Sequence, residues 1–194
     1  GVDPRVPTTK LFDEAFQRAL EELPSGPAKA SEVEHAIKAH IKVNLEQDPE
    51  YYQSLSLRLK EIIEKYEDKW DELVEQLLLF RGEMEEEQAN QARDLGLTET
   101  ELAFHNILMA EITNTSGDIS MDEVTRHQLL DLIRQLVKEF ENASQIVGSF
   151  QNDYELRRMR RNIRRAMISQ GFEDPSLIRN VIERFMDLWN ARFR

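Results

Sequence analysis

Apolar residues recur every three or four positions along almost the whole chain, and this spacing restricts the fold more than any other feature. Such spacing places side chains on one face of an α-helix, whereas a half-buried strand needs strict alternation. No segment alternates in this way with β-branched residues, so no sheet is predicted. The seven glycines and six prolines fall mainly between the periodic segments, where they would end or begin helices. The sequence therefore predicts an all-α array of seven or eight helices, one or two of them long.

Each predicted helix has an apolar stripe and a recognisable start or stop. The predicted helices cover residues 9–22, 31–47, 50–66, 70–93, 98–112, 121–147, 153–170 and 175–193. The third and fourth are either one long helix or two helices joined near Asp68. Ser31 with Glu34, and Thr98 with Glu101, fit the capping-box pattern, and Gly96 fits a left-handed C-terminal cap.

The pattern of helices also predicts the domain organisation. Residues 1–8 are expected to form an extended leader, and residues 9–194 a single helical domain. Two sub-bundles that meet near residues 94–98 are the alternative arrangement.

Composition restricts the location and the partners of the chain. Cysteine is absent, which excludes disulfides and thiolate chemistry and favours the reducing cytoplasm. No apolar run approaches the roughly 20 residues of a membrane span, so no membrane association is predicted. The net charge is −12, yet residues 153–194 hold ten arginines against six acids, or +4. This balance argues against nucleic-acid binding over the whole surface and identifies an arginine-rich C-terminal end.

The sequence has no recognisable catalytic constellation. The glycines are too isolated to build a phosphate-binding loop, so no nucleotide cofactor is predicted. His35 and His40 are five residues apart, which places them on different faces of a helix and disfavours a zinc pair. The triplet at residues 67–69 has the E-x-K form found in metal-dependent nucleases, but no strand is predicted to supply the further carboxylate that this chemistry needs. We therefore predict no catalytic, cofactor-binding or metal-binding residue.

The strongest local feature is a run of arginines in the helix predicted at residues 153–170. Its apolar stripe consists of Leu156, Met159, Ile163, Ala166 and Met167. The opposite face carries what we call the arginine ridge, which consists of Arg157, Arg158, Arg161, Arg164 and Arg165. Arginine suits bidentate contacts to carboxylate or phosphate. The ridge is consistent with an acidic protein surface in this chain or a partner, with the DNA backbone, or with a solvated face.

Two other groups of residues are candidate contact surfaces. An acidic patch consists of Glu83, Glu85, Glu86 and Glu87, and it is either a solvated face or the complement of a basic surface. Trp70 and Trp189 are predicted to lie in the core. An apolar stripe near the chain end, formed by Phe185, Trp189 and Phe193, is a candidate docking surface for a partner.

Four ordered stretches carry a resemblance to a known family. They read EHAIKAHIKV at residues 34–43, DPEYY at 48–52, LSLRLKEII at 55–63 and LGLTETELAF at 95–104. With these stretches, an arginine-rich helix and a last amphipathic helix, the chain resembles the C-terminal helical region of the restriction (R) subunit of type I restriction-modification enzymes. Leu57 departs from the family pattern, which usually has glutamate there, and Tyr154 stands in a neighbourhood that often has tryptophan.

The resemblance implies a role without chemistry of its own. The parent R subunit is an ATP-dependent deoxyribonuclease, and its ATP and magnesium sites lie in nuclease and helicase-like domains outside this chain. The family's C-terminal region supports the motor and docks it on the modification and specificity subunits, with DNA reached through the complex. The alternative is a helical module that binds the DNA backbone next to the motor through the arginine ridge.

Overall fold

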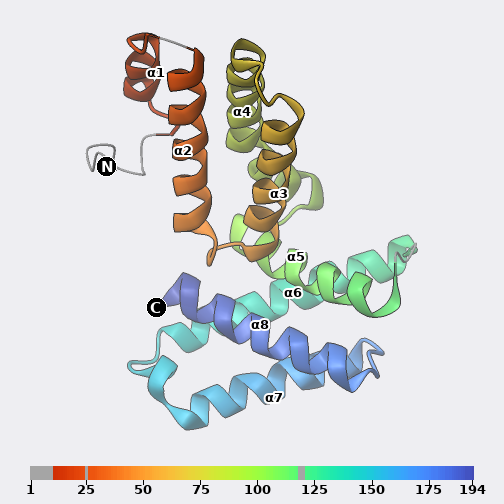
Figure 1. Ribbon diagram of the computed structural model, residues 1–194. Helices are drawn as coiled ribbons and strands as arrows, with labels where there is room; N and C mark the ends of the chain where they lie inside the picture. The colour runs from red at the N-terminus through yellow and green to blue at the C-terminus, as the bar shows by residue number, and fades with distance from the viewer. Residues whose placement is uncertain (1–10, 25, 118–120) are drawn as a thin grey trace. The chain divides into compact units, whose positions relative to one another are not determined.

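Most residues that the computed structural model describes are helical, and the described residues are 11–24, 26–117 and 121–194. The predicted leader at residues 1–8 lies outside them. The helices are α1 (Glu14–Glu21), α2 (Gly26–Asn44), α3 (Pro49–Lys65), α4 (Trp70–Leu95), α5 (Glu99–Ser116), α6 (Glu123–Ser144), α7 (Asp153–Ser169) and α8 (Pro175–Phe193), with a 3-10 turn at Ser149–Gln151 (Figure 1). Within the described residues, these eight α-helices and the absence of strands confirm the predicted all-α class.

The chain divides into two compact units. Unit 1 comprises Gly1–Leu45 and Tyr51–Asn90, and unit 2 comprises Glu46–Glu50 and Gln91–Arg194. The break after Asn90 falls within α4, just before the predicted meeting point at residues 94–98. The segment Glu46–Glu50, which ends with the first two residues of α3, thus belongs to unit 2, although α2 and the rest of α3 belong to unit 1.

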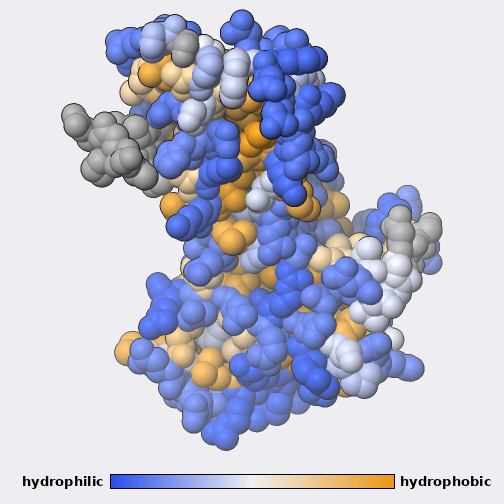
Figure 2. Space-filling view, in the orientation of Figure 1, coloured by the Kyte–Doolittle hydropathy of each residue, from blue (hydrophilic) through white to orange (hydrophobic). Residues whose placement is uncertain are grey.

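Each unit has its own apolar core. In unit 1 the core side chains come from α1 to α4 and include Phe16, Ile37, Leu55 and Leu77. In unit 2, α8 packs against α5, α6 and α7. The unit 2 core contains Phe104 and Phe140, whose rings stack with centroids 5.1 Å apart. The surface of unit 2 that faces the viewer in Figure 2 is covered mainly by hydrophilic residues, including those along α7 at the lower edge.

Several predicted helix boundaries are confirmed by local capping. Thr98 and Glu101 form the reciprocal capping box, with Thr98 N donating to Glu101 Oε2 at 2.7 Å and Glu101 N to Thr98 Oγ1 at 3.2 Å. Gly96 has a φ of +64°, which glycine adopts without steric cost. Of the two arrangements left open for residues 50–93, the structure has two helices, because Asp68 adopts a φ of +66° between α3 and α4.

Other boundaries differ from the prediction. The second helix begins at Gly26 rather than Ser31, so the predicted capping box at Ser31 and Glu34 is wrong. A Cβ on Gly26 would lie 2.9 Å from Asp71 Oδ1 and 3.0 Å from Trp70 Cβ, so a larger residue at this start would require these side chains to shift. The first helix starts five residues later than predicted, at Glu14, and α5 continues to Ser116 through part of the predicted loop.

Candidate functional site

The arginine ridge lies on a helix that is firmly held in the core of unit 2. Asn152 caps α7 by accepting hydrogen bonds from the amides of Tyr154 and Glu155, at 2.9 and 3.4 Å. Met159, Ile163 and Met167 are each 0% exposed. The predicted apolar stripe is therefore confirmed, and the arginines on the other face are carried by a fixed helix.

Most of the ridge arginines form no ion pair among the described residues. Arg158 is the exception, because its Nη2 lies 2.8 Å from Oε2 of the buried Glu155. Arg157 is exposed and donates from Nε to the Asp153 carbonyl oxygen at 3.1 Å. Arg161, Arg164 and Arg165 are exposed and form no ion pair with any residue that the structure describes. These three side chains are free to bind an anionic group outside the chain.

The acidic patch is partly engaged within unit 1. Arg58 on α3 contacts Glu83 at 2.7 Å and Glu87 at 2.8 Å on α4, and its guanidinium lies 4.9 Å from the Phe80 ring centroid. Glu85 and Glu86 are exposed and take part in no ion pair among the described residues. Two of the four glutamates, Glu83 and Glu87, are thus paired with Arg58 of the same chain.

The proposed apolar docking stripe needs correction. Phe185 and Trp189 are each 0% exposed, and Phe193 is partly buried against the same core. Trp189 Nε1 donates to the Phe140 carbonyl oxygen at 3.1 Å and to Ser144 Oγ at 2.8 Å. Helix α6 and the turn before α7 cover this stripe, so it forms core rather than a surface for a partner. Trp70, predicted to lie in the core, is 43% exposed at the start of α4.

An ionic cluster in unit 2 was missed by the sequence analysis. Glu111 on α5 is 6% exposed, and its carboxylate accepts hydrogen bonds from Arg184 Nη1 at 2.8 Å and Asn180 Nδ2 at 3.1 Å. Arg184 on α8 also donates to Glu50 through Nη2. Burial by itself would lower the pKa of Arg184, but its hydrogen bonds to Glu50 and Glu111 outweigh that effect and raise it. The guanidinium is therefore held charged between two carboxylates.

Hydrogen bonds outside the ionic cluster also hold the segment Glu46–Glu50 within unit 2. Arg192 Nε donates to the Gln47 carbonyl oxygen at 2.6 Å, and Gln47 Nε2 donates to the Ala191 carbonyl oxygen at 3.0 Å. Asp48 is 0% exposed and accepts from Asn106 Nδ2 at 3.4 Å. Contacts from both α5 and α8 therefore fix the backbone and the side chains of this segment.

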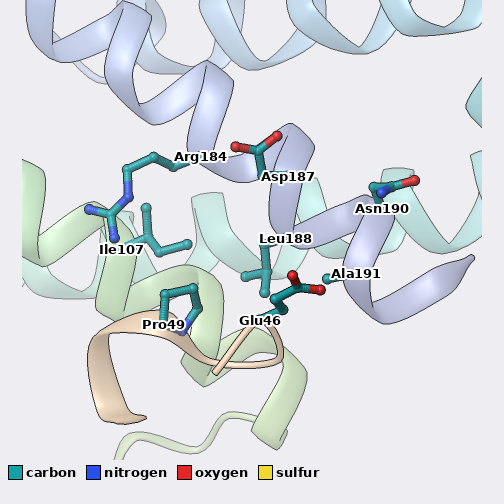
Figure 3. Close-up of a pocket in the computed structure, with 8 residues that line it drawn as sticks. All are labelled: Glu46, Pro49, Ile107, Arg184, Asp187, Leu188, Asn190 and Ala191. Atoms are coloured by element: carbon teal, nitrogen blue, oxygen red, sulfur yellow. The ribbon is translucent and has the colours of Figure 1, made fainter. Parts of the chain in front are cut away.

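A cavity of about 360 Å³ lies beside the cluster (Figure 3). Pro49, Ile107 and Leu188 supply apolar walls, and Asp187, Asn190 and Glu46 supply polar groups. Figure 3 shows the Arg184 guanidinium at one side of this space and Asn190 at the other. Arg184 is already bound by two carboxylates. The polar groups of the cavity that remain are the carboxylates of Glu46 and Asp187 and the amide of Asn190.

A sequence signal for the ionic cluster existed, although it was weak. Glu111 stands beside Ile112 and four residues after Ile107, and Arg184 stands beside Phe185 and three residues after Val181. A charge beside the apolar stripe of an amphipathic helix indicates a buried partner of opposite sign. The pattern could not identify which of the many acids and arginines pair.

Further observations bear on chemistry and location. Within the described residues, no three side chains of the types His, Cys, Asp and Glu gather where they could hold a metal ion. The E-x-K triplet lies in the turn between α3 and α4, where Lys69 Nζ is 3.7 Å from Glu72 Oε2. No described helix has both the length and the apolar character that crossing a membrane requires.

A partly buried histidine in unit 2, His105, predicts a pH dependence of stability. Burial lowers the pKa of His105 below its ordinary value of 6.5, so the unfolded chain takes up this proton more readily than the folded chain. The stability that His105 contributes is complete above pH 6.5 and is lost as the pH falls through the lower folded pKa. We expect His105→Gln to shrink the difference in urea midpoint between about pH 7.5 and about pH 5.5. An unchanged difference would contradict this assignment.

Comparison with known proteins adds family information. A family model described as "Type I restriction enzyme HindI endonuclease subunit-like, C-terminal" matches residues 3–186. The "Putative type I restriction enzyme MjaIXP endonuclease subunit" of Methanocaldococcus jannaschii is 37% identical over 73 residues, which are 36% of this chain. That match spans only 7% of the relative's own length. No solved structure matches the chain significantly.

Proposed function

The chain belongs to the family of type I restriction enzyme HindI endonuclease subunit-like C-terminal regions, and from this membership we propose that it is a non-catalytic assembly domain. In this proposal the domain supports the ATP-dependent DNA translocase and nuclease of its parent subunit. It also docks that subunit on the methyltransferase core formed by the modification and specificity subunits. The parts that bind ATP, magnesium and the cleaved DNA belong to other regions of the parent subunit.

The observation that carries the docking proposal is the free face of the arginine ridge. Arg161, Arg164 and Arg165 are exposed, form no ion pair among the described residues, and stand on a helix whose other face is buried. Held on a fixed helix, such side chains lose less conformational freedom on binding than they would on a mobile loop. Arginine is also enriched among the residues that dominate the energy of protein interfaces.

An acidic protein surface suits this face better than DNA. Unit 2 contains 14 lysines and arginines against 19 acids, so its net charge is −5 despite the ridge. The negative charge of unit 2 would repel an extended polyanion such as DNA, whereas a compact acidic patch on a protein can contact the arginine ridge alone. The DNA backbone is the second candidate, since the same guanidinium groups also suit phosphate.

Binding of the purified chain to the modification–specificity complex tests the proposal. We expect binding at about 50 mM salt that weakens as salt screens the ridge. Replacing Arg157, Arg161, Arg164 and Arg165 together by glutamate should lower the affinity by about a hundredfold. The matched variant with lysine at the same four positions keeps the positive charge and should retain most of the binding.

One control and two results distinguish docking on an acidic protein surface from binding of the DNA backbone. Circular dichroism must show that both variants keep the helical content of the wild-type chain, since the substituted side chains are exposed. Equal binding by the glutamate and wild-type chains would refute docking through the ridge. Retention of a DNA duplex but not of the complex would favour the second candidate.

A further inference from the structure

A small crevice opens between α7 and α8, on the arginine-rich side of unit 2. Its volume is about 150 Å³, and it is lined by Arg160, Arg161, Arg164, Arg179, Ile182 and Glu183. Arg179 was not part of the arginine ridge, because it comes from α8. The packing of the two helices brings it together with Arg161 and Arg164.

The positive charge of the α7–α8 crevice is only partly neutralised from within. Arg160 Nη1 binds Glu183 Oε1 at 2.7 Å. Arg161, Arg164 and Arg179 are exposed and have no ion-pair partner among the described residues. Four arginines against one glutamate leave the lining with a net charge of +3. The crevice is therefore built to receive an anionic group.

The arginines are supported by buried neighbours. Ile163 lies between Arg161 and Arg164 in the sequence and is 0% exposed, and Ile182 on the crevice wall is 4% exposed. Arg161 and Arg164 are three residues apart, so they share one side of α7. Backbone positions fixed by core packing lower the entropy that the guanidinium groups lose when they close on a ligand.

We propose that the α7–α8 crevice binds the carboxylate of an aspartate or glutamate side chain from a partner protein. The proposal rests on the proposed docking function and names the chemistry of the group that is recognised. Each guanidinium can give two parallel N–H donors to a carboxylate. A crevice of about 150 Å³ is large enough to accommodate such a side-chain end.

Two features favour a carboxylate over a phosphate of the DNA backbone. First, Glu183 already places a carboxylate against Arg160, which shows that this geometry fits the spacing between the helices. Second, unit 2 keeps a net charge of −5, which repels a polyanion more strongly than a single acidic side chain.

The test compares two arginine variants of the full 194-residue chain. Arg179→Gln removes one positive charge at the crevice, and Arg194→Gln removes one at the exposed end of the same helix. The probe is a fluorescent synthetic peptide rich in glutamate, and its counterpart has glutamine at every glutamate position. We expect the glutamate peptide alone to bind, Arg179→Gln to weaken it about tenfold, and Arg194→Gln to leave it nearly unchanged.

Each other outcome overturns the proposal. Equal weakening by Arg179→Gln and Arg194→Gln would show diffuse attraction rather than a site. Equal binding of the two peptides would exclude carboxylate recognition. A DNA duplex that binds more tightly than the glutamate peptide, and is weakened more by Arg179→Gln, would assign the crevice to phosphate.

Binding to the modification–specificity complex distinguishes the crevice proposal from the docking function proposed above. If Arg179→Gln binds the complex as tightly as the wild-type chain does, the crevice proposal fails while docking stands. If the wild-type chain binds the glutamate peptide through Arg179 but never binds the complex, docking fails and carboxylate recognition stands.

Discussion

Replacing Trp189 by alanine is expected to lower the free energy of unfolding of unit 2 by about 3–5 kcal/mol. The indole is 0% exposed, and its centroid lies 5.5 Å from the Phe140 ring and 4.5 Å from the Phe150 ring. Truncation leaves a cavity among rings that cannot all move inward. It also removes the hydrogen bonds that Nε1 donates to the Phe140 carbonyl oxygen and to Ser144 Oγ, although Ser144 Oγ still donates to that carbonyl.

The chain contains a matched control, because its only other tryptophan is largely outside the core. Trp70 is 43% exposed, so Trp70→Ala should cost about 1 kcal/mol or less. Urea unfolding followed by circular dichroism measures both losses. Amide hydrogen exchange in α6 and α8 then assigns the larger one to unit 2. Similar losses for the two variants would mean that Trp189 is not a core residue.

Replacing Arg184 by methionine is expected to cost about 3 kcal/mol, at the lower end of the range for breaking a buried ion pair. The side chain of Glu111 is 8% exposed and would be left with only Asn180 as a hydrogen-bond partner. The side chain of Glu50 is 28% exposed and recovers some hydration, which moderates the loss. Methionine preserves much of the aliphatic packing, so the measured change reports mainly on the charge.

Two comparisons identify the cause of that loss. The double variant Arg184→Met with Glu111→Met removes the stranded charge and should recover at least half of the stability, since apolar replacement of a buried pair is often neutral. Arg160→Met breaks the exposed pair with Glu183, whose side chains are 41% and 55% exposed, and should cost less than about 1 kcal/mol. Equal costs for Arg184→Met and Arg160→Met in urea unfolding would contradict the structural role assigned to Arg184.

Sequence periodicity predicted the helices well where local chemistry fixes their ends. The last helix has the predicted limits, because Asp174 and Pro175 form a strong start and the chain end follows. The predicted start of the second helix was wrong. Ser31 and Glu34 fit a capping pattern, but the residues before them also form helix. The close approach of Gly26 to the start of α4 is a contact between distant parts of unit 1, which spacing alone does not reveal.

The candidate sites also depend on contacts between distant parts of the chain, which the spacing of residues does not reveal. The two faces of α7 were predictable from the helical wheel of residues 156–167, and the structure confirms the buried face. Which apolar stripe is covered depends on neighbouring helices. The core position predicted for Trp189 is confirmed, whereas the docking role predicted for the stripe with Phe185 and Trp189 is wrong. The partners of Arg184 lie 73 and 134 residues away along the chain, and Arg179 joins the crevice only through the packing of α7 on α8.

The placement of Glu46–Glu50 in unit 2 has a consequence for the order in which contacts form while the chain is being synthesised. During synthesis this segment emerges before all of α4 to α8. Glu50 and Asp48 must therefore wait for Arg184 and Asn106, while the helices around them can already begin to fold. A gene fragment that starts at residue 91 would encode every helix wholly within unit 2 and still lack one carboxylate of its ionic cluster. Neither unit can be separated from the other by a single cut in the chain.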